Sequence, residues 1–307
     1  MKNIPLNRPS GQRSCLRMFT LIALAVSGVV RFSPDQAVAS NPSPVAEPLR
    51  AGASQISFAL PVWIHIPEDV QASKAPILIV MHGARRNADR YRDQWIDAAN
   101  AEGLIVVAPA FSRDDFPNAA GYNLGAVFEG DGTTAREESL WAFSAIEPLF
   151  DHIVASLDGA QTHYSIYGHS AGSQFVHRFL FFKPDARVKR YIAANAGWYT
   201  FADPAIAFPF GLGGLEISEE AIQQALAKDV IIALGDKDSD PNSRLLNKSE
   251  GAMRQGPHRY ARGQAFFAAA KALATEKGWK FGWSKREVKG VAHSNGDMAS
   301  RVADLVR

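Results

Sequence analysis

A serine stands between two close glycines in the segment HYSIYGHSAGSQ, residues 163–174. A serine hydroxyl becomes a useful nucleophile only when the backbone holds it outward and a base accepts its proton. In a sharp strand–turn–helix elbow, side chains two positions before and after the serine would clash, and Gly168 and Gly172 remove that clash. The segment therefore predicts an exposed nucleophile, Ser170, with a plain turn as the alternative.

Two further segments supply the partners that such a serine needs. Asp236 and Asp238 follow the apolar run DVIIALG, and His293 follows the last expected strand, in GVAHSNG. A catalytic histidine needs a carboxylate to fix its tautomer and to stabilise its imidazolium form. We favour Asp238, because the chain must turn back after Gly235 before an acid can reach inward, and Asp236 is the alternative. The chain order serine, acid, histidine, each after a strand, predicts a catalytic triad.

An acyl-transfer site also needs backbone N–H donors for the oxyanion that forms during attack. The amide of Ala171 lies at the elbow itself. A second donor is expected in the loop after ILIVMHG, from the amide of Ala84 or from that of Gly83. Four residues on loops that follow strands are candidates for substrate binding: Arg85, Asn87, Asn123 and Trp198.

The chain from residue 55 onward alternates strand patterns with helix patterns. Continuous apolar runs such as ILIVMHG and LIVVAPA are typical of strands that are buried on both faces. Between the strands we expect helices, including continuous ones over 87–103 and 134–157. The alternation predicts an α/β fold with a doubly wound, mostly parallel sheet, helices on both faces and no large lid. Ligands bind such sheets at the carboxyl ends of the strands, where the residues above lie.

The first 39 residues have the pattern of an export signal. Four basic residues and no acid precede an apolar run over 18–30, and Ala37-Val38-Ala39 is typical of a signal-peptidase site. The run has 13 residues, whereas crossing a bilayer takes about 20, so an uncleaved membrane anchor is the less favoured alternative. We expect a signal peptide at 1–39, a Pro- and Ser-rich leader at 40–54, a catalytic domain at 55–307 and a periplasmic or extracellular protein.

Composition excludes several classes of function. Without residues 1–39 the chain keeps 28 basic and 30 acidic residues and no basic stripe, so nucleic acid is not an expected partner. The single cysteine, Cys15, leaves with the signal, and no HExxH motif or clustered His and Asp set appears. We expect no metal, no cofactor and no membrane anchor after signal cleavage. The expected partner is a small-molecule or oligomeric ester substrate, and the oligomeric state stays open.

From about residue 55 onward the chain resembles α/β-hydrolases, in particular the secreted enzymes that are similar to polyhydroxybutyrate depolymerases and feruloyl esterases. The matching segments are ILIVMHGARRNADRY, VVAPAF, YGHSAGS, LGDKD and GVAHS. The resemblance implies a serine esterase that uses Ser170, Asp238 and His293 as its triad, with Ala84 and Ala171 as oxyanion donors.

These features together predict an exported serine hydrolase that cleaves carboxylic esters through an acyl-enzyme. A serine peptidase or an acyltransferase can use the same three residues. A binding protein that keeps the fold without turnover is a further alternative, which the intact set of three residues disfavours.

Overall fold

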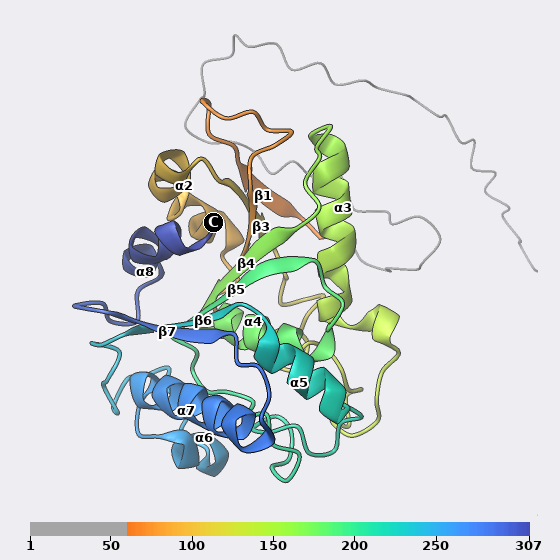
Figure 1. Cartoon of the computed structure of the whole chain (residues 1–307), viewed down its shortest axis with the longest axis vertical. Helices are drawn as coiled ribbons and strands as arrows, with labels where there is room; N and C mark the ends of the chain where they lie inside the picture. Colours follow the sequence, from red (N-terminus) through yellow and green to blue (C-terminus); the bar gives the residue numbers. More distant parts are fainter. Residues whose placement is uncertain (1–59) are drawn as a thin grey trace, which may run out of the picture. The chain divides into compact units, whose positions relative to one another are not determined.

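The computed structural model describes residues 60–307, so the predicted signal peptide, the leader and the first residues of the catalytic domain lie outside the described residues. A seven-stranded sheet runs through the described part in the order β1-β3-β2-β4-β5-β6-β7 (Figure 1). Its strands are β1 (Val62–His65), β2 (Ile77–Met81), β3 (Ile105–Pro109), β4 (Tyr164–His169), β5 (Val188–Ala194), β6 (Val230–Gly235) and β7 (Trp283–Val288). Strand β1 pairs antiparallel with β3 and the other neighbours pair in parallel, which confirms the predicted sheet.

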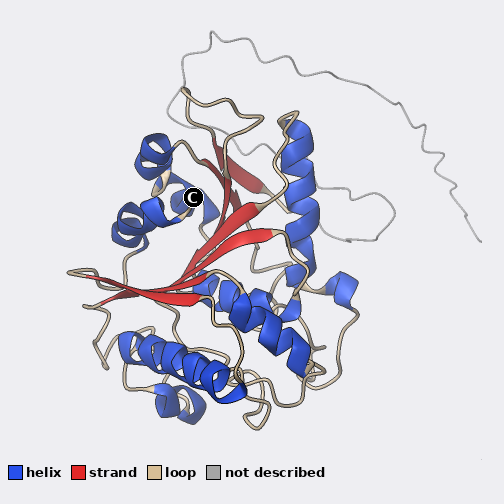
Figure 2. Ribbon diagram, in the orientation of Figure 1, coloured by secondary structure: helices blue, strands red, loops and turns tan. Residues whose placement is uncertain are grey.

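Helices cover both faces of this sheet, as predicted (Figure 2). One face carries α1 (Ala88–Asp93), α2 (Ile96–Glu102) and α8 (Asn295–Val302). The other carries α3 (Ile146–Ser156), α4 (Ala171–Phe182), α5 (Glu219–Ala227) and α7 (Arg259–Lys277), and α6 (Glu250–Gln255) packs against α7. No large lid covers the sheet within the described residues.

The apolar strands divide their side chains between two cores. In β2, Ile79 packs in the core that lies against α4, whereas its neighbour Val80 packs in the core under α1 and α8. Successive side chains of a strand point to opposite faces. A strand with cores on both sides therefore has to be apolar at every position, which explains the continuous run ILIVM.

Two predicted helices are shorter than expected. The 87–103 segment forms α1 and α2, with a break at which the fully buried Trp95 meets the ring of Tyr167 edge-on. The 134–157 segment becomes α-helical only at Ile146, after 3₁₀ turns at Glu138–Leu140 and Ala142–Ala145. Pro148 explains this start, because proline lacks the N–H of a helix interior and is tolerated in a first turn.

The helices of residues 60–307 include none with the combined length and hydropathy that a membrane crossing needs.

Candidate active site

Ser170 lies in the sharp turn between β4 and α4. Its φ of 60° and ψ of −116° are values that a non-glycine residue rarely adopts. A Cβ added at Gly168 would lie 2.2 Å from the carbonyl oxygen of Gly172, and one added at Gly172 would lie 2.0 Å from that of Met81. Both positions therefore require glycine, and the turn presses α4 against the ends of β2 and β4.

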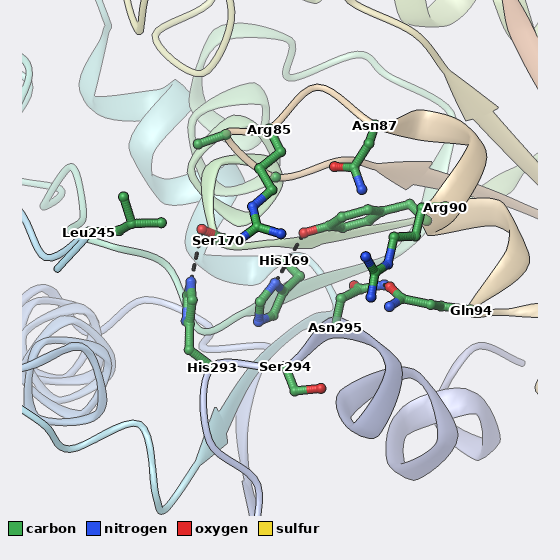
Figure 3. A pocket seen from close by; sticks show the side chains of 13 residues that line it. Arg85, Asn87, Arg90, Gln94, His169, Ser170, Leu245, His293, Ser294 and Asn295 are labelled. Carbon is green, nitrogen blue, oxygen red and sulfur yellow. Dashed lines mark hydrogen bonds between the residues drawn. The ribbon is translucent and has the colours of Figure 1, made fainter. Parts of the chain in front are cut away.

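Two side chains from other strand ends meet Ser170. His293 Nε2 lies 3.0 Å from Ser170 Oγ (Figure 3), and His293 Nδ1 lies 2.7 Å from Asp238 Oδ2. The Asp238 carboxylate is buried, whereas the His293 side chain is 24% exposed and so remains open to a ligand. The structure thus connects the three predicted residues in one hydrogen-bonded series.

The alternative acid has a different place. Asp236 Oδ1 accepts a hydrogen bond of 2.8 Å from the backbone amide of Gly290. This bond joins the turn after β6 to the turn after β7. Asp238, two residues on, is the carboxylate that faces the histidine, as the need for the chain to turn back suggested.

Arg259 is a contact of the acid that sequence reasoning missed. Its Nη1 donates to Asp238 Oδ1 at 3.1 Å, and both side chains are nearly inaccessible to solvent. The amide of Tyr260 donates to the backbone carbonyl of Asp238, which fastens the start of α7 to the same turn. Nothing in the local sequence marks this pairing, since the two residues are 21 positions apart.

Backbone amides border the nucleophile on two sides. The first backbone bond of α4 runs from Gln174 N to the Ser170 carbonyl, so the Ala171 amide belongs to the helix N-terminus, where N–H groups have no intrahelical partner. A Cβ added at Gly83 would lie 3.7 Å from Ser170 Cβ, so the loop after β2 is the second neighbour. Within residues 60–307 the Ala84 amide donates to no protein acceptor. Free amides at a helix N-terminus and in a tight loop favour negative charge.

His82 fixes the start of that loop. It is fully buried, and burial lowers its pKa to about 3. The neutral ring accepts a bond from the Phe111 amide at Nε2 and contacts the Gly83 carbonyl through Nδ1 at 3.1 Å. His82 therefore joins the ends of β2 and β3 beside the nucleophile.

A pocket of about 320 Å³ opens next to Ser170 and His293. Its polar lining includes Arg85, Asn87, Arg90, Gln94 and Asn295 (Figure 3). No Asp or Glu of the described residues lines it, and the guanidinium groups of Arg85 and Arg90 pair with no carboxylate there. The pocket is therefore positively charged.

Two of the four predicted substrate-binding residues, Arg85 and Asn87, line this pocket, and Asn123 and Trp198 do not. Asn123 Nδ2 donates to Gln174 Oε1 at 2.9 Å, and the Trp198 ring lies 4.3 Å from the Arg178 guanidinium. Both are nearly buried in a packed cluster beside α4. A position after a strand does not fix where a side chain points, so neither lies in this pocket, and their part in substrate binding stays a prediction.

Arg90 and Gln94 were missed, although a signal for them existed. Asn87, Arg90 and Gln94 have the i, i+3, i+7 spacing of one helix face, and α1 together with its two cap residues brings them to the pocket. Asn295 was missed as well. It follows His293 by two residues, and its side chain bonds Gln94 Oε1 at 2.7 Å.

In the described part of the chain, no three His, Cys, Asp or Glu side chains are grouped so that they could hold a metal ion.

No family model and no curated protein matches this sequence. Solved structures do match. Poly(aspartic acid) hydrolase-1 from Sphingomonas sp. KT-1 is 41% identical, with a TM-score of 0.79 over 81% of this chain and 94% of that chain. The poly(3-hydroxybutyrate) depolymerase LpqC from Bordetella parapertussis is 34% identical, with a TM-score of 0.75 over 80% of this chain and 83% of that chain.

The siderophore hydrolase EstB from Aspergillus nidulans shares the fold at 16% identity, with a TM-score of 0.53 over 88% of this chain and 97% of that chain. The chain belongs to the α/β-hydrolase superfamily, as the resemblance of its segments implied. Its relatives are hydrolases, which supports a hydrolase here too.

Proposed function

We propose that this chain is an exported serine hydrolase that cleaves carboxylic esters. The observation that carries the proposal is the series of contacts from Asp238 through His293 to Ser170, at 2.7 and 3.0 Å, on the carboxyl side of parallel strands. A hydroxyl next to a histidine, which is itself held by a buried carboxylate, is the arrangement that activates a serine nucleophile.

In the proposed reaction Ser170 Oγ attacks the ester carbonyl carbon, and its proton passes to His293 Nε2. The amides of Ala171 and Ala84 hold the oxyanion of the tetrahedral intermediate. His293 then gives its proton to the leaving alcohol, which leaves an acyl group on Ser170. Water attacks this acyl-enzyme with His293 again as the base, and the acid product and the free serine result. Asp238 keeps the Nδ1 proton of His293 in place throughout.

Hydrolysis of short p-nitrophenyl esters by residues 40–307 tests the proposal. Ser170→Ala should lower kcat by at least about 10³-fold. Ser173→Ala is the matched control, since Ser173 is buried in the same helix and its hydroxyl has no hydrogen-bond partner in the described chain. A folded wild-type protein without turnover would refute the esterase assignment, and a fully active Ser170→Ala variant would refute the proposed nucleophile.

Export rests on the sequence of residues 1–39. Expression of the full chain in a bacterium, followed by fractionation and intact mass measurement, tests it. The expected product is periplasmic or secreted and begins at Ser40. A full-length product that stays in the inner-membrane fraction would instead indicate an uncleaved anchor.

A second candidate activity is hydrolysis of the amide bonds of an anionic polymer. It is favoured by the positive pocket, in which Arg85 and Arg90 face no carboxylate of the described residues. Poly(aspartic acid) hydrolase-1, the relative at 41% identity, is named for such a polymer. A triad that cleaves esters can also cleave amides by the same steps.

Incubation with poly(aspartic acid), followed by size-exclusion chromatography and an assay for new amino groups, tests this candidate. Shorter chains and new amines that the Ser170→Ala variant does not produce would support it. Intact polymer beside rapid ester turnover would restrict the chain to esters.

A further inference from the structure

Two buried side chains beside the proposed triad have no role in the reaction described above. His169 is the last residue of β4, directly before Ser170, and Tyr91 lies in α1. Tyr91 Oη lies 3.2 Å from His169 Nδ1, and the rings of His169 and His293 are 4.6 Å apart between centroids. Figure 3 shows the side chain of His169 next to that of His293. The pair thus lies between α1 and the catalytic histidine.

The Tyr91 hydroxyl also meets the loop after β2. A Cβ added at Gly83 would lie 2.5 Å from Tyr91 Oη, so the hydroxyl fills the space that only a glycine leaves open. Burial raises the pKa of the Tyr91 phenol, and a hydrogen bond from the Gly83 backbone opposes that rise. The Tyr91 hydroxyl is therefore packed directly against the backbone of Gly83.

Burial keeps both side chains of this pair in their neutral forms. The phenol keeps its proton because burial raises its pKa, so its hydroxyl can donate to His169 Nδ1 at 3.2 Å. Burial, followed by the nearby charges of His293 and Arg259, holds the pKa of His169 well below its ordinary value. The histidine is therefore neutral and can accept. Its remaining ring proton is on Nε2, which is buried without a hydrogen-bond partner in the described chain.

The bridge from Gly83 through Tyr91 to His169 joins the two loops that supply the proposed oxyanion donors. Gly83 precedes Ala84, and His169 precedes Ser170 and the Ala171 amide. The Tyr91 hydroxyl thus lies against the backbone at the start of that loop, directly before the Ala84 amide. Oxyanion donors work only when they lie about 2.7–3.1 Å from the developing charge.

We propose that Tyr91 and His169 are positioning residues that set the distance between the Ala84 amide and the Ser170 nucleophile. The inference rests on the proposed serine-hydrolase function. It assigns to the histidine inside GHSAG a task apart from proton transfer to substrate. Removing either end of the bridge frees the Gly83 loop to shift, and a displacement of about 1 Å at such a site can cost about 100-fold in rate.

Steady-state kinetics of Tyr91→Phe with p-nitrophenyl butyrate is the central experiment. We expect kcat to fall about 10- to 100-fold while KM changes less than about threefold, because the oxyanion contact forms in the transition state. Affinity for a trifluoromethyl ketone, which forms an oxyanion on the serine, should fall by the same factor as kcat/KM. Tyr191→Phe is the matched control, since its buried hydroxyl has no hydrogen-bond partner among the described residues and lies in β5.

Two variant sets test whether the pair acts as one bridge. His169→Phe should lower kcat by the same factor as Tyr91→Phe. The double variant should lower kcat no further than either single variant, because each single variant already removes the contact between the two side chains. His169→Asn places an amide oxygen near the position of Nδ1 and should restore most of kcat. Gly83→Ala should be rescued in part by Tyr91→Phe, because the added methyl then faces the ring carbon at 3.4 Å instead of the oxygen at 2.5 Å.

The results separate this inference from the proposed function. Full kcat in Tyr91→Phe, with turnover still dependent on Ser170, overturns the positioning role and leaves the hydrolase intact. A second result also overturns the positioning role and indicates a purely structural one. In that result KM rises by the same factor as the ketone affinity falls, the melting temperature is lowered, and His169→Asn does not restore kcat. Absence of Ser170-dependent turnover in the wild type would instead refute the proposed function.

Discussion

Charged side chains near Ser170 fall into two groups that differ in burial and pairing. Arg259 and Asp238 are 2% and 4% exposed and pair with each other. Arg85 and Arg90 are exposed, line the pocket and pair with no carboxylate of the described residues. A buried ion costs several kcal/mol unless a partner compensates it, whereas an exposed one costs little. The ion pair of Arg259 and Asp238 is therefore suited to orienting His293, and the exposed Arg85 and Arg90 are suited to binding a ligand.

The largest expected effect concerns the buried carboxylate. Asp238→Asn keeps the shape but offers an N–H₂ group to His293, which favours the wrong tautomer of the ring and should lower kcat by about 10⁴-fold. Asp236→Asn is the matched control and should keep kcat within about threefold, because among residues 60–307 its carboxylate bonds only a backbone amide in the turn. Kinetics with p-nitrophenyl butyrate checks both. The reverse ranking would show that Asp236 is the triad acid.

Removing the buried cation should act mainly on stability. Arg259→Met leaves the Asp238 carboxylate buried without its arginine, so we expect the free energy of unfolding to fall by about 3–5 kcal/mol. Urea denaturation measures this. Arg254→Met is the control, because it breaks an exposed i,i+4 pair with Glu250, which is worth about 1 kcal/mol at most. If the free energy of unfolding fell by a similar amount in the two variants, the buried and the exposed ion pair would not differ in their contribution to stability.

The fold could be predicted because its information is local. Continuous apolar strands such as ILIVM and the glycine elbow at Ser170 each indicate one structure with few competitors. The missed helix boundaries have local causes too. Pro148 favours a helix start nearby and is visible in the sequence, whereas the break at Trp95 coincides with its contact with Tyr167, more than 70 residues away.

The site was less predictable because its details depend on long-range contacts. The order of Ser170, Asp238 and His293 could be found from strand ends alone. The bond from Arg259 to Asp238 could not, since it needs the start of α7 to lie against the turn after β6. The direction of Trp198 was likewise set by its contact with Arg178.

His82 is buried like the Arg259–Asp238 pair, but it carries no charge. His82 has a folded pKa of about 3, below its ordinary value of 6.5. Between these values the unfolded chain binds a proton that the folded chain does not, so stability should fall as pH drops from 6.5 towards 3, by about 1.4 kcal/mol per pH unit for this residue. Urea denaturation of His82→Gln at several pH values should show a slope reduced by that amount. The exposed His152→Gln is the control, and equal slopes in both variants would show that His82 does not stay neutral.

The smallest expected effect belongs to the open arginines. Arg85→Gln and Arg90→Gln should change the free energy of unfolding by no more than about 0.5 kcal/mol, since no internal partner is lost. Each should lower the ratio of kcat/KM for mono-p-nitrophenyl succinate to that for p-nitrophenyl butyrate by about two- to fivefold, the worth of one exposed charge contact. The two esters differ in a carboxylate, so their ratio isolates charge recognition from catalysis.

Ionic strength and an exposed arginine outside the pocket lining complete this last test. Raising the ionic strength from about 0.01 to 1 M shortens the Debye length from about 30 to 3 Å. It should therefore lower the same ratio in the wild type and have little effect on a variant that combines Arg85→Gln with Arg90→Gln. Arg244→Gln, exposed and outside the pocket, is the control. A ratio that depends equally on Arg244 would mean that the net charge of the surface attracts anions. Arg85 and Arg90 would then have no specific part in substrate recognition. They would differ from the Arg259–Asp238 pair only in their exposure to solvent.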